Sequence, residues 1–304
     1  MLSTLAHSSE IPEVKLLPGV GCAVVVGRAG QDVTAKCTVR VGEANYIVLA
    51  VFDGHGGKEG KDGKLSNEAA LAGARVINSL SDPNNKYGLT GIPNVEKILE
   101  AIHEEFKASE DDTSGSTATI VVICKNKVKG RILGDSAIRI FRNNKTVKKY
   151  TGASPNDKEV RDQVIARGGE VRYFAWANVW RLVCDSGETL ATASGIGDYN
   201  TRGVDKEGVP FEFELAPNEI LLIGSDGLDD INNSCLDSNF QFAKEDCKGD
   251  IQQTASMFAE LVYCASGGRR CGADDVAVIL FQQESIDEVD ELVEAITDLA
   301  AAGP

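Results

Sequence analysis

Short apolar runs rich in Val, Ile and Thr recur along the chain, and Gly, Asn or Asp bounds each of them, which is the pattern of β-strands. We predict strands at residues 21–26, 33–41, 46–52, 117–124, 128–133, 138–141, 180–183, 211–215, 219–223 and 276–281. Apolar residues spaced by threes and fours predict helices at residues 67–80, 95–107, 158–166, 254–264 and 285–301. Because the strands cluster instead of alternating strictly with helices, we expect antiparallel sheets with helices on their outer faces.

The length and composition favour one large domain with a real core, since 42% of the 304 residues are hydrophobic and 25% are charged. We divide the chain into an N-terminal extension (1–19), a main domain (20–283) and an acidic C-terminal helix (284–304) that packs on the same domain. We find no membrane-length apolar run and no secretory signal. We therefore expect no membrane partner and a cytoplasmic protein, with the nucleus as an alternative.

The charge balance is strongly acidic, with 31 Lys and Arg against 46 Asp and Glu, a net charge of −15. This excess disfavours a nucleic-acid partner, because the phosphates would be repelled. It does not exclude a phosphate-bearing substrate where bound cations reverse the local field. The eight cysteines form no Cys-x-x-Cys pair and the chain has three histidines, so we expect reduced thiols and no zinc cluster.

Carboxylates stand at the ends or starts of several predicted strands. The apolar strand at 46–52 leads directly into Asp53, Gly54 and His55. Taken alone, Asp53 and Gly54 also suit an ordinary turn. Further carboxylates at strand termini are Asp135, Asp226, Asp230 and Asp274. Carboxylate and backbone oxygens suit Mg²⁺ or Mn²⁺, and a cluster of carboxylates is costly unless cations fill it. The pattern therefore predicts a site for more than one metal ion.

Eight blocks of sequence give this pattern a family resemblance. They are residues 27–32, 53–57, 114–118, 133–136, 166–171, 197–198, 225–230 and 274–278. In this order they resemble the metal-dependent serine/threonine phosphatases of the protein phosphatase 2C type. The resemblance implies an α+β fold, a four-layer α/β-β/α sandwich of two antiparallel sheets flanked by helices. It also implies that residues 20–283 are the catalytic domain, with two or three Mg²⁺ or Mn²⁺ ions and a phosphoprotein substrate. We expect the protein to be a monomer.

The resemblance assigns metal-binding roles to the strand-end carboxylates. Asp53 would bridge two ions, with the carbonyl of Gly54 on one of them. Asp226 and Asp274 would hold the other ion. Positions that match an additional metal in the family are Asp135 and Asp230, together with Asp226.

The resemblance also assigns the catalytic chemistry, the dephosphorylation of phosphoserine and phosphothreonine. A hydroxide that bridges the metals would attack phosphorus in line, and His55 would act as the general acid for the departing alkoxide. Gln31 and Asp32 match an acidic pair that supports metal-bound water, although Gln31 is a neutral amide. The nearest candidate for the family's phosphate-binding arginine is Arg28, which lies about one residue out of register.

Some residues near these blocks have simpler interpretations, and the function has alternatives. Asp198 and Asp229 suit plain caps or solvated turns, and His103 suits a surface position on a helix. The main functional alternative is a pseudophosphatase that acts as a protein-binding module, which the loss of a core carboxylate would favour. A two-metal hydrolase of another ester, such as a nuclease, is disfavoured because the chain lacks a basic groove.

Overall fold

Two five-stranded antiparallel sheets form the centre of this computed structural model, which describes residues 19–27, 30–57, 67–107, 114–199, 201–268 and 273–283. One sheet has the order β1 (Val20–Val25), β16 (Val276–Gln282), β15 (Glu219–Gly224), β8 (Ala137–Arg142) and β9 (Lys145–Thr151). The other has the order β14 (Val209–Glu214), β7 (Lys127–Leu133), β6 (Ala118–Cys124), β3 (Ala44–Phe52) and β2 (Val33–Val41). The predicted acidic helix and, apart from Gly19, the predicted extension lie outside the described residues.

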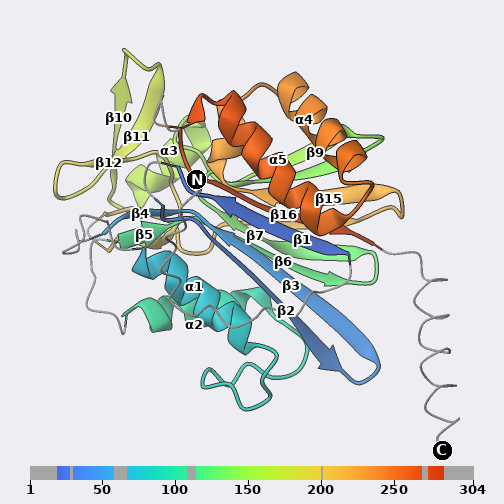
Figure 1. The fold of residues 1–304 in the computed structure, drawn as a ribbon. Helices are drawn as coiled ribbons and strands as arrows, with labels where there is room; N and C mark the ends of the chain where they lie inside the picture. Colours follow the sequence, from blue (N-terminus) through green and yellow to red (C-terminus); the bar gives the residue numbers. More distant parts are fainter. Residues whose placement is uncertain are drawn as a thin grey trace, which may run out of the picture.

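Helices cover the outer face of each sheet, so the molecule has four layers (Figure 1). The helices α1 (Glu68–Ser79) and α2 (Val95–Lys107) pack on the sheet that contains β3, and α4 (Asn233–Asp246) and α5 (Ile251–Ala265) pack on the sheet that contains β16. This arrangement confirms the predicted four-layer sandwich of the α+β class.

The strand β3 shows why its sequence is apolar almost throughout. Val48, Ala50 and Phe52 point toward α1 and α2, whereas Leu49 and Val51 point into the core between the two sheets. A strand buried on both faces has no polar side, so the alternation expected of a half-buried strand is absent. The strand ends directly at Asp53, which places that carboxylate at the edge of the sandwich.

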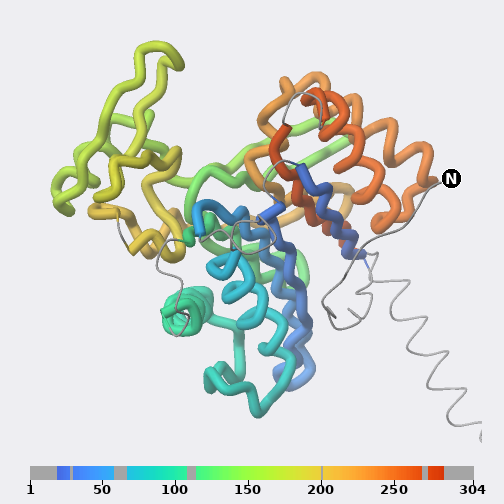
Figure 2. The backbone as a smooth tube through the Cα atoms, turned by 60° about the vertical axis from the view of Figure 1, so that its left-hand side comes forward, coloured from blue at the N-terminus to red at the C-terminus, as the bar shows by residue number. Residues whose placement is uncertain are grey.

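Two smaller sheets lie beside the sandwich. One comprises β10 (Glu170–Phe174), β11 (Val179–Val183) and β12 (Thr189–Leu190), and the other comprises β13 (Ile196–Gly197), β5 (Ser114–Ser116) and β4 (Gly54–Gly56). The first projects away from the main body as a long hairpin, next to α3 (Lys158–Ala166) (Figures 1 and 2). The second brings the segment after β3 against the segment before β6, which is where the candidate site lies.

The ten predicted strands and the first four predicted helices are present, with small shifts at their ends. The fifth helix, at 285–301, lies outside the described residues. The sequence did not predict α4, in which only Leu236, Phe240 and Ala243 are buried, or the polar edge strand β9. The strands β4, β5, β10, β12 and β13 were also missed. None of the helices in the described ranges is long and apolar enough to cross a membrane.

Candidate metal centre

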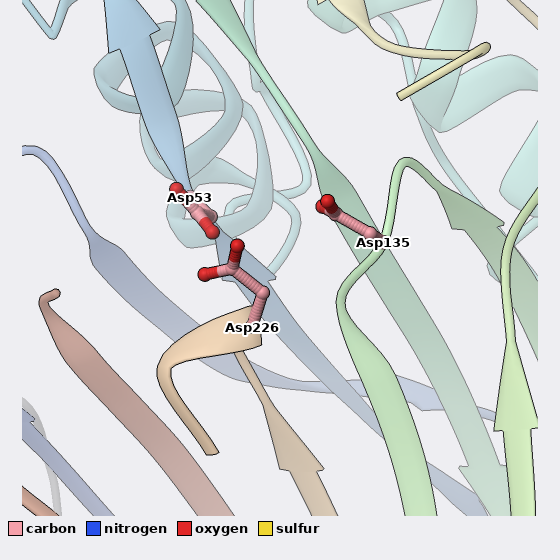
Figure 3. Close-up of side chains that lie close together, drawn as sticks. All are labelled: Asp53, Asp135 and Asp226. Atoms are coloured by element: carbon pink, nitrogen blue, oxygen red, sulfur yellow. The ribbon is translucent and has the colours of Figure 1, made fainter. Parts of the chain in front are cut away.

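Three carboxylates from separate strand ends meet at one edge of the sandwich. Asp53 follows β3, Asp135 lies between β7 and β8, and Asp226 begins the short 3-10 helix η1 (Asp226–Asp230) after β15. One carboxylate oxygen from each of the three residues lies within 4.8 Å of the other two. Figure 3 shows the side chains of Asp53 and Asp226 directed toward each other, with Asp135 beside them. Three oxygens at this spacing suit a hard divalent cation.

Hydrogen bonds through Thr117 connect the segments that carry two of these carboxylates. The Asp53 N–H donates to Thr117 Oγ1 over 3.2 Å, and the Thr117 N–H donates to the Asp53 carbonyl over 2.9 Å. The same Thr117 Oγ1 shares a hydrogen bond of 2.8 Å with the hydroxyl of Ser136, the residue after Asp135. Thr117 and Ser136 are buried, so these bonds are shielded from water. The segments of Asp53 and Asp135 are therefore linked and have little freedom to separate.

The environment of the cluster opposes the ionisation of its carboxyls. Burial, followed by repulsion from neighbouring carboxylates, raises the pKa of Asp53 well above its ordinary value and that of Asp226 to about 7. Burial raises the pKa of Asp32 to about 8, and its Oδ2 has no hydrogen-bond partner among the described residues. Buried carboxyls without a cationic partner are unfavourable, and a divalent cation supplies that partner. These residues therefore fit a metal ion.

Two predicted metal ligands lie outside the group of three. Asp274 is exposed two residues before β16, and its Oδ1 accepts a hydrogen bond of 2.8 Å from the Asp275 N–H. Its charge still raises the pKa of Asp226, so it lies near the cluster. Asp230, at the end of η1, is largely exposed, and the partial desolvation of its carboxyl, followed by the charge of Asp274, raises its pKa. Both residues border the cluster on the side of β16 and η1.

Gly54 and Gln31 pack against each other beside Asp53. Gly54 is buried in β4, and a Cβ at that position would lie 2.8 Å from the Gln31 carbonyl oxygen, so the contact requires glycine. Gln31 is buried, and its Nε2 donates to the carbonyl of Gly56 over 3.1 Å. The amide therefore bonds to the backbone after His55. Arg28 lies outside the described residues.

Asp275, which the sequence analysis did not single out, anchors the loop that carries Gln31 and Asp32. Its two buried carboxylate oxygens accept hydrogen bonds from four backbone N–H groups, at Gly27, Gly30, Gln31 and Asp32. The distances from these nitrogens are 2.6, 3.0, 2.7 and 3.4 Å respectively. Asp275 therefore joins the start of β16 to the loop before β2. No local sequence signal reveals this pairing, because the partners are more than 240 residues apart.

His55 forms an ion pair with Asp198, which corrects the interpretation of Asp198 as a plain cap or solvated turn. His55 Nε2 lies 2.9 Å from Asp198 Oδ1 and 3.1 Å from Oδ2, and the carboxylate side chain is 5% exposed. Burial lowers the pKa of His55, but the charge and hydrogen bond of Asp198 outweigh it, so the pKa is raised overall. Gly115 lies beneath the pair, since a Cβ there would overlap both side chains. The pair therefore requires glycine at this position.

Asp229 is also more than a solvated turn, because two cations hold it. The almost fully buried Arg139 bonds to Asp229 through Nη2 and to Asn233 Oδ1 through Nη1, the latter over 2.9 Å. Lys149 Nζ lies 2.9 and 2.8 Å from the two Asp229 oxygens. These contacts tie η1 to β8 and β9, and so fix the helix that carries Asp226 and Asp230.

Two further side chains differ from the predictions or were missed. His103 is only half-exposed, and its Nε2 lies 3.2 Å from the Lys206 carbonyl oxygen, so it is not a free surface histidine. Arg181 of β11 lies close enough to Asp135 for its charge to lower the pKa of that carboxyl, against the larger effect of burial. Within the described part of the chain, no hydrogen bond or ion pair engages the Arg181 guanidinium. Arg181 is therefore a cation near the carboxylate cluster that has no hydrogen-bond or ion-pair partner among the described residues.

Comparisons with known proteins find relatives of a single family. A family model described as "Protein phosphatase 2C" matches residues 37–234. "Protein phosphatase 2C 3" of Arabidopsis thaliana is 31% identical over 257 residues, which are 76% of this chain and 55% of that protein. "Probable protein phosphatase 2C 11" of the same plant is 26% identical over 196 residues, which are 62% of this chain and 48% of that protein. The chain thus spans about half the length of these curated relatives.

Solved structures show the same fold. A serine-threonine phosphatase 2C from Toxoplasma gondii superposes with a TM-score of 0.67 at 16% identity, covering 88% of this chain and 96% of that one. A sex-determining protein from C. elegans superposes with a TM-score of 0.60 at 21% identity, covering 86% of this chain and 64% of that one. At these identities the likeness establishes the architecture alone.

Proposed function

Because the chain belongs to the protein phosphatase 2C family, we propose that it hydrolyses phosphoserine and phosphothreonine in proteins with the help of two or three divalent cations, Mg²⁺ or Mn²⁺. The observation that carries this proposal is the meeting of Asp53, Asp135 and Asp226 at one edge of the sandwich, with their oxygens within 4.8 Å of one another. The core carboxylates that the pseudophosphatase alternative would lack are all present. Their presence favours the enzyme over the binding module.

The metal ligands in this proposal are Asp53, Asp226 and Asp274, with the carbonyl of Gly54, and Asp135 and Asp230 serve a further ion. When bound, the ions supply a water of lowered pKa and offset charge on the phosphoryl oxygens. Gln31 and Asp32 border this site, and Asp275 holds their loop by four backbone hydrogen bonds. Arg28 is proposed as a phosphate ligand, and Arg181, which lies near Asp135, adds positive charge on the side of β11.

His55 provides the proton for the leaving group in this proposal. The alkoxide of serine or threonine is a poor leaving group, so its oxygen must be protonated as the bond to phosphorus breaks. The proton resides on the imidazolium, and Asp198 supports it because its carboxylate raises the pKa of His55 against the effect of burial. A donor with a raised pKa keeps its proton near neutral pH, which is what a general acid needs.

The test is hydrolysis of a phosphothreonine peptide by the purified full chain with millimolar Mn²⁺. We expect turnover that EDTA abolishes, and loss of at least about a hundredfold in kcat for Asp53→Asn, since removing a metal ligand disables the nucleophile and the charge stabilisation together. Asp162→Asn is the matched control, because Asp162 is exposed on α3 and, within the described ranges, forms an ion pair only with Lys158. Absence of turnover on phosphopeptides and aryl phosphates, in a protein that still folds, would instead favour the binding module.

A further inference from the structure

A half-buried lysine, Lys206, contacts the turn that carries Asp198, the partner of His55. Lys206 Nζ donates a hydrogen bond to the carbonyl oxygen of Gly197, the residue before Asp198. The same ammonium lies 5.5 Å from the centre of the Tyr199 ring, on its face. Burial lowers the pKa of Lys206 to about 8, whereas the charges of Asp198 and Asp205 act in the opposite direction. The ammonium group of Lys206 therefore contacts the residues on both sides of Asp198.

This turn has an unfavourable backbone that needs support. Gly197 and Asp198 have φ angles of 74° and 50°, so two successive residues adopt the left-handed region. Glycine tolerates that region, but an aspartate there is strained. The Asp198 N–H makes only a long hydrogen bond of 3.3 Å, to the Ser114 carbonyl. Because Lys206 bonds the carbonyl between the two left-handed residues, it opposes the relaxation of the turn.

Lys206 itself is held by the scaffold. Its carbonyl oxygen lies 3.2 Å from His103 Nε2 on α2, a contact in which the histidine nitrogen is the donor. The preceding residue, Asp205, accepts a hydrogen bond from the Gly195 N–H over 3.0 Å and donates one to the Ala193 carbonyl over 2.9 Å. The lysine thus reaches the turn from a fixed point, which is a condition for a side chain that sets the position of another group.

We propose that Lys206 is a positioning residue, which holds the left-handed Gly197–Asp198 turn so that the Asp198 carboxylate stays aligned with His55. The proposal rests on the proposed function, in which His55 protonates the leaving group. Lys206 does not act on the phosphate, because its Nζ is bonded to Gly197. Its charge lowers the pKa of His55, against the larger raising effect of Asp198, so its support of the pair is positional and not electrostatic. Loss of the lysine should therefore affect proton donation and leave the carboxylate cluster intact.

Substrates with different leaving groups distinguish a loss of proton donation from damage to the carboxylate cluster. The alkoxide of phosphothreonine needs a proton, whereas p-nitrophenolate departs as a stabilised anion. For Lys206→Met we expect kcat on a phosphothreonine peptide to fall roughly 10- to 100-fold, the range for one lost hydrogen bond of a charged group. On p-nitrophenyl phosphate kcat should stay within about threefold of the unaltered enzyme. Lys148→Met is the matched control, because Lys148 is exposed and also lies over a tyrosine ring, that of Tyr150, at 4.6 Å.

A double-mutant cycle with His55→Ala identifies the route of the effect. If Lys206 acts through the pair, its loss should cost little further peptide activity once His55 is absent. Additive losses, or equal losses on both substrates, would overturn the proposal. Should the methionine variant unfold, Lys206→Gln takes its place in the same cycle, because glutamine is polar but has no charge, and its amide nitrogen lies one bond closer to the backbone than the lysine nitrogen that bonds to Gly197.

An independent readout distinguishes failure of this inference from failure of the proposed function. The nitrogen-15 spectrum of the histidine rings contains three residues to assign, and it requires no activity. Lys206→Met should shift the ring resonances of His55, whereas Lys148→Met should not. Unchanged His55 resonances would overturn the positioning role even in an active enzyme. Shifted resonances in a protein without phosphatase activity would support the positioning role and refute the proposed function instead.

Discussion

Asp226→Asn should stabilise the protein in EDTA and make it respond less to Mn²⁺. The pKa of Asp226 rises from 3.8 to about 7 in the folded protein, because of burial and then repulsion from Asp135 and Asp274. Between these two values the unfolded chain loses a proton that the folded protein retains. The free energy of unfolding therefore falls as the pH rises from about 4 to about 7. At 1.36 kcal/mol per unit, the full effect is on the order of 4 kcal/mol.

The assay is thermal unfolding with EDTA or Mn²⁺ at several values from about pH 5 to about pH 8. In EDTA at about pH 8, we expect the melting temperature of Asp226→Asn to exceed that of the unaltered protein by on the order of 10 °C for a chain of this size. At about pH 5 the two melting temperatures should differ little. Subtracting the melting temperatures of variant and unaltered protein at each pH removes the effects of all other groups. Asp162→Asn is again the control, because its side chain is 60% exposed.

Two results would refute this reasoning. One is a difference between Asp226→Asn and the unaltered protein that does not grow with pH in EDTA, since repulsion among ionised carboxylates must grow with pH. The other is equal stabilisation of both proteins by Mn²⁺, which would mean that Asp226 is not a ligand. The first result would mean that the pKa of Asp226 is not raised in the folded protein, and the second would remove Asp226 from the proposed metal ligands.

Two further predictions concern the His55–Asp198 pair. Asp198→Asn should lower the pKa of His55, because the Asp198 carboxylate raises it. In a pH profile of kcat on the phosphopeptide, the decline on the alkaline side should therefore begin at a lower pH than in the unaltered protein. An unchanged profile would contradict the role of Asp198. Gly115→Ala should lower kcat on the phosphopeptide by about tenfold or more, because the added methyl group overlaps the side chains of His55 and Asp198. Stabilisation by Mn²⁺ should be retained. Activity equal to that of the unaltered protein would show that His55 and Asp198 can move aside.

The sequence could predict that the carboxylates gather at one edge because local patterns mark the positions of Asp53, Asp135 and Asp226. Asp53 follows a continuous apolar strand, and Asp226 follows another, so the chain itself marks where each strand ends. In antiparallel sheets these ends return to a common edge, which is why residues far apart in the chain could be expected together. Asp135 lies at the same edge for the same reason, at the turn from β7 to β8.

The groups that position the site left no comparable pattern. Asp198 meets His55 across 143 residues, from a turn whose left-handed backbone no periodicity indicates. Lys206 lies in a polar turn, where a lysine is most simply interpreted as solvated. Asp275 bonds a loop at the other end of the chain. Such residues act through tertiary contacts, so only the folded arrangement reveals them.

The rigidity of the surroundings explains why the cluster keeps its unfavourable charges close. Mobile carboxylates would move apart and restore ordinary pKa values, but the backbone of Asp53 is bonded on both sides to Thr117. Ser225, before Asp226, is bonded to Ala277 in both directions, with its N–H donating over 3.1 Å and its hydroxyl accepting over 3.0 Å. Protons or cations must therefore neutralise the cluster, since it cannot relax. The net charge of −15 includes carboxylates from which a binding metal ion would displace protons, so proton release and metal affinity are linked there.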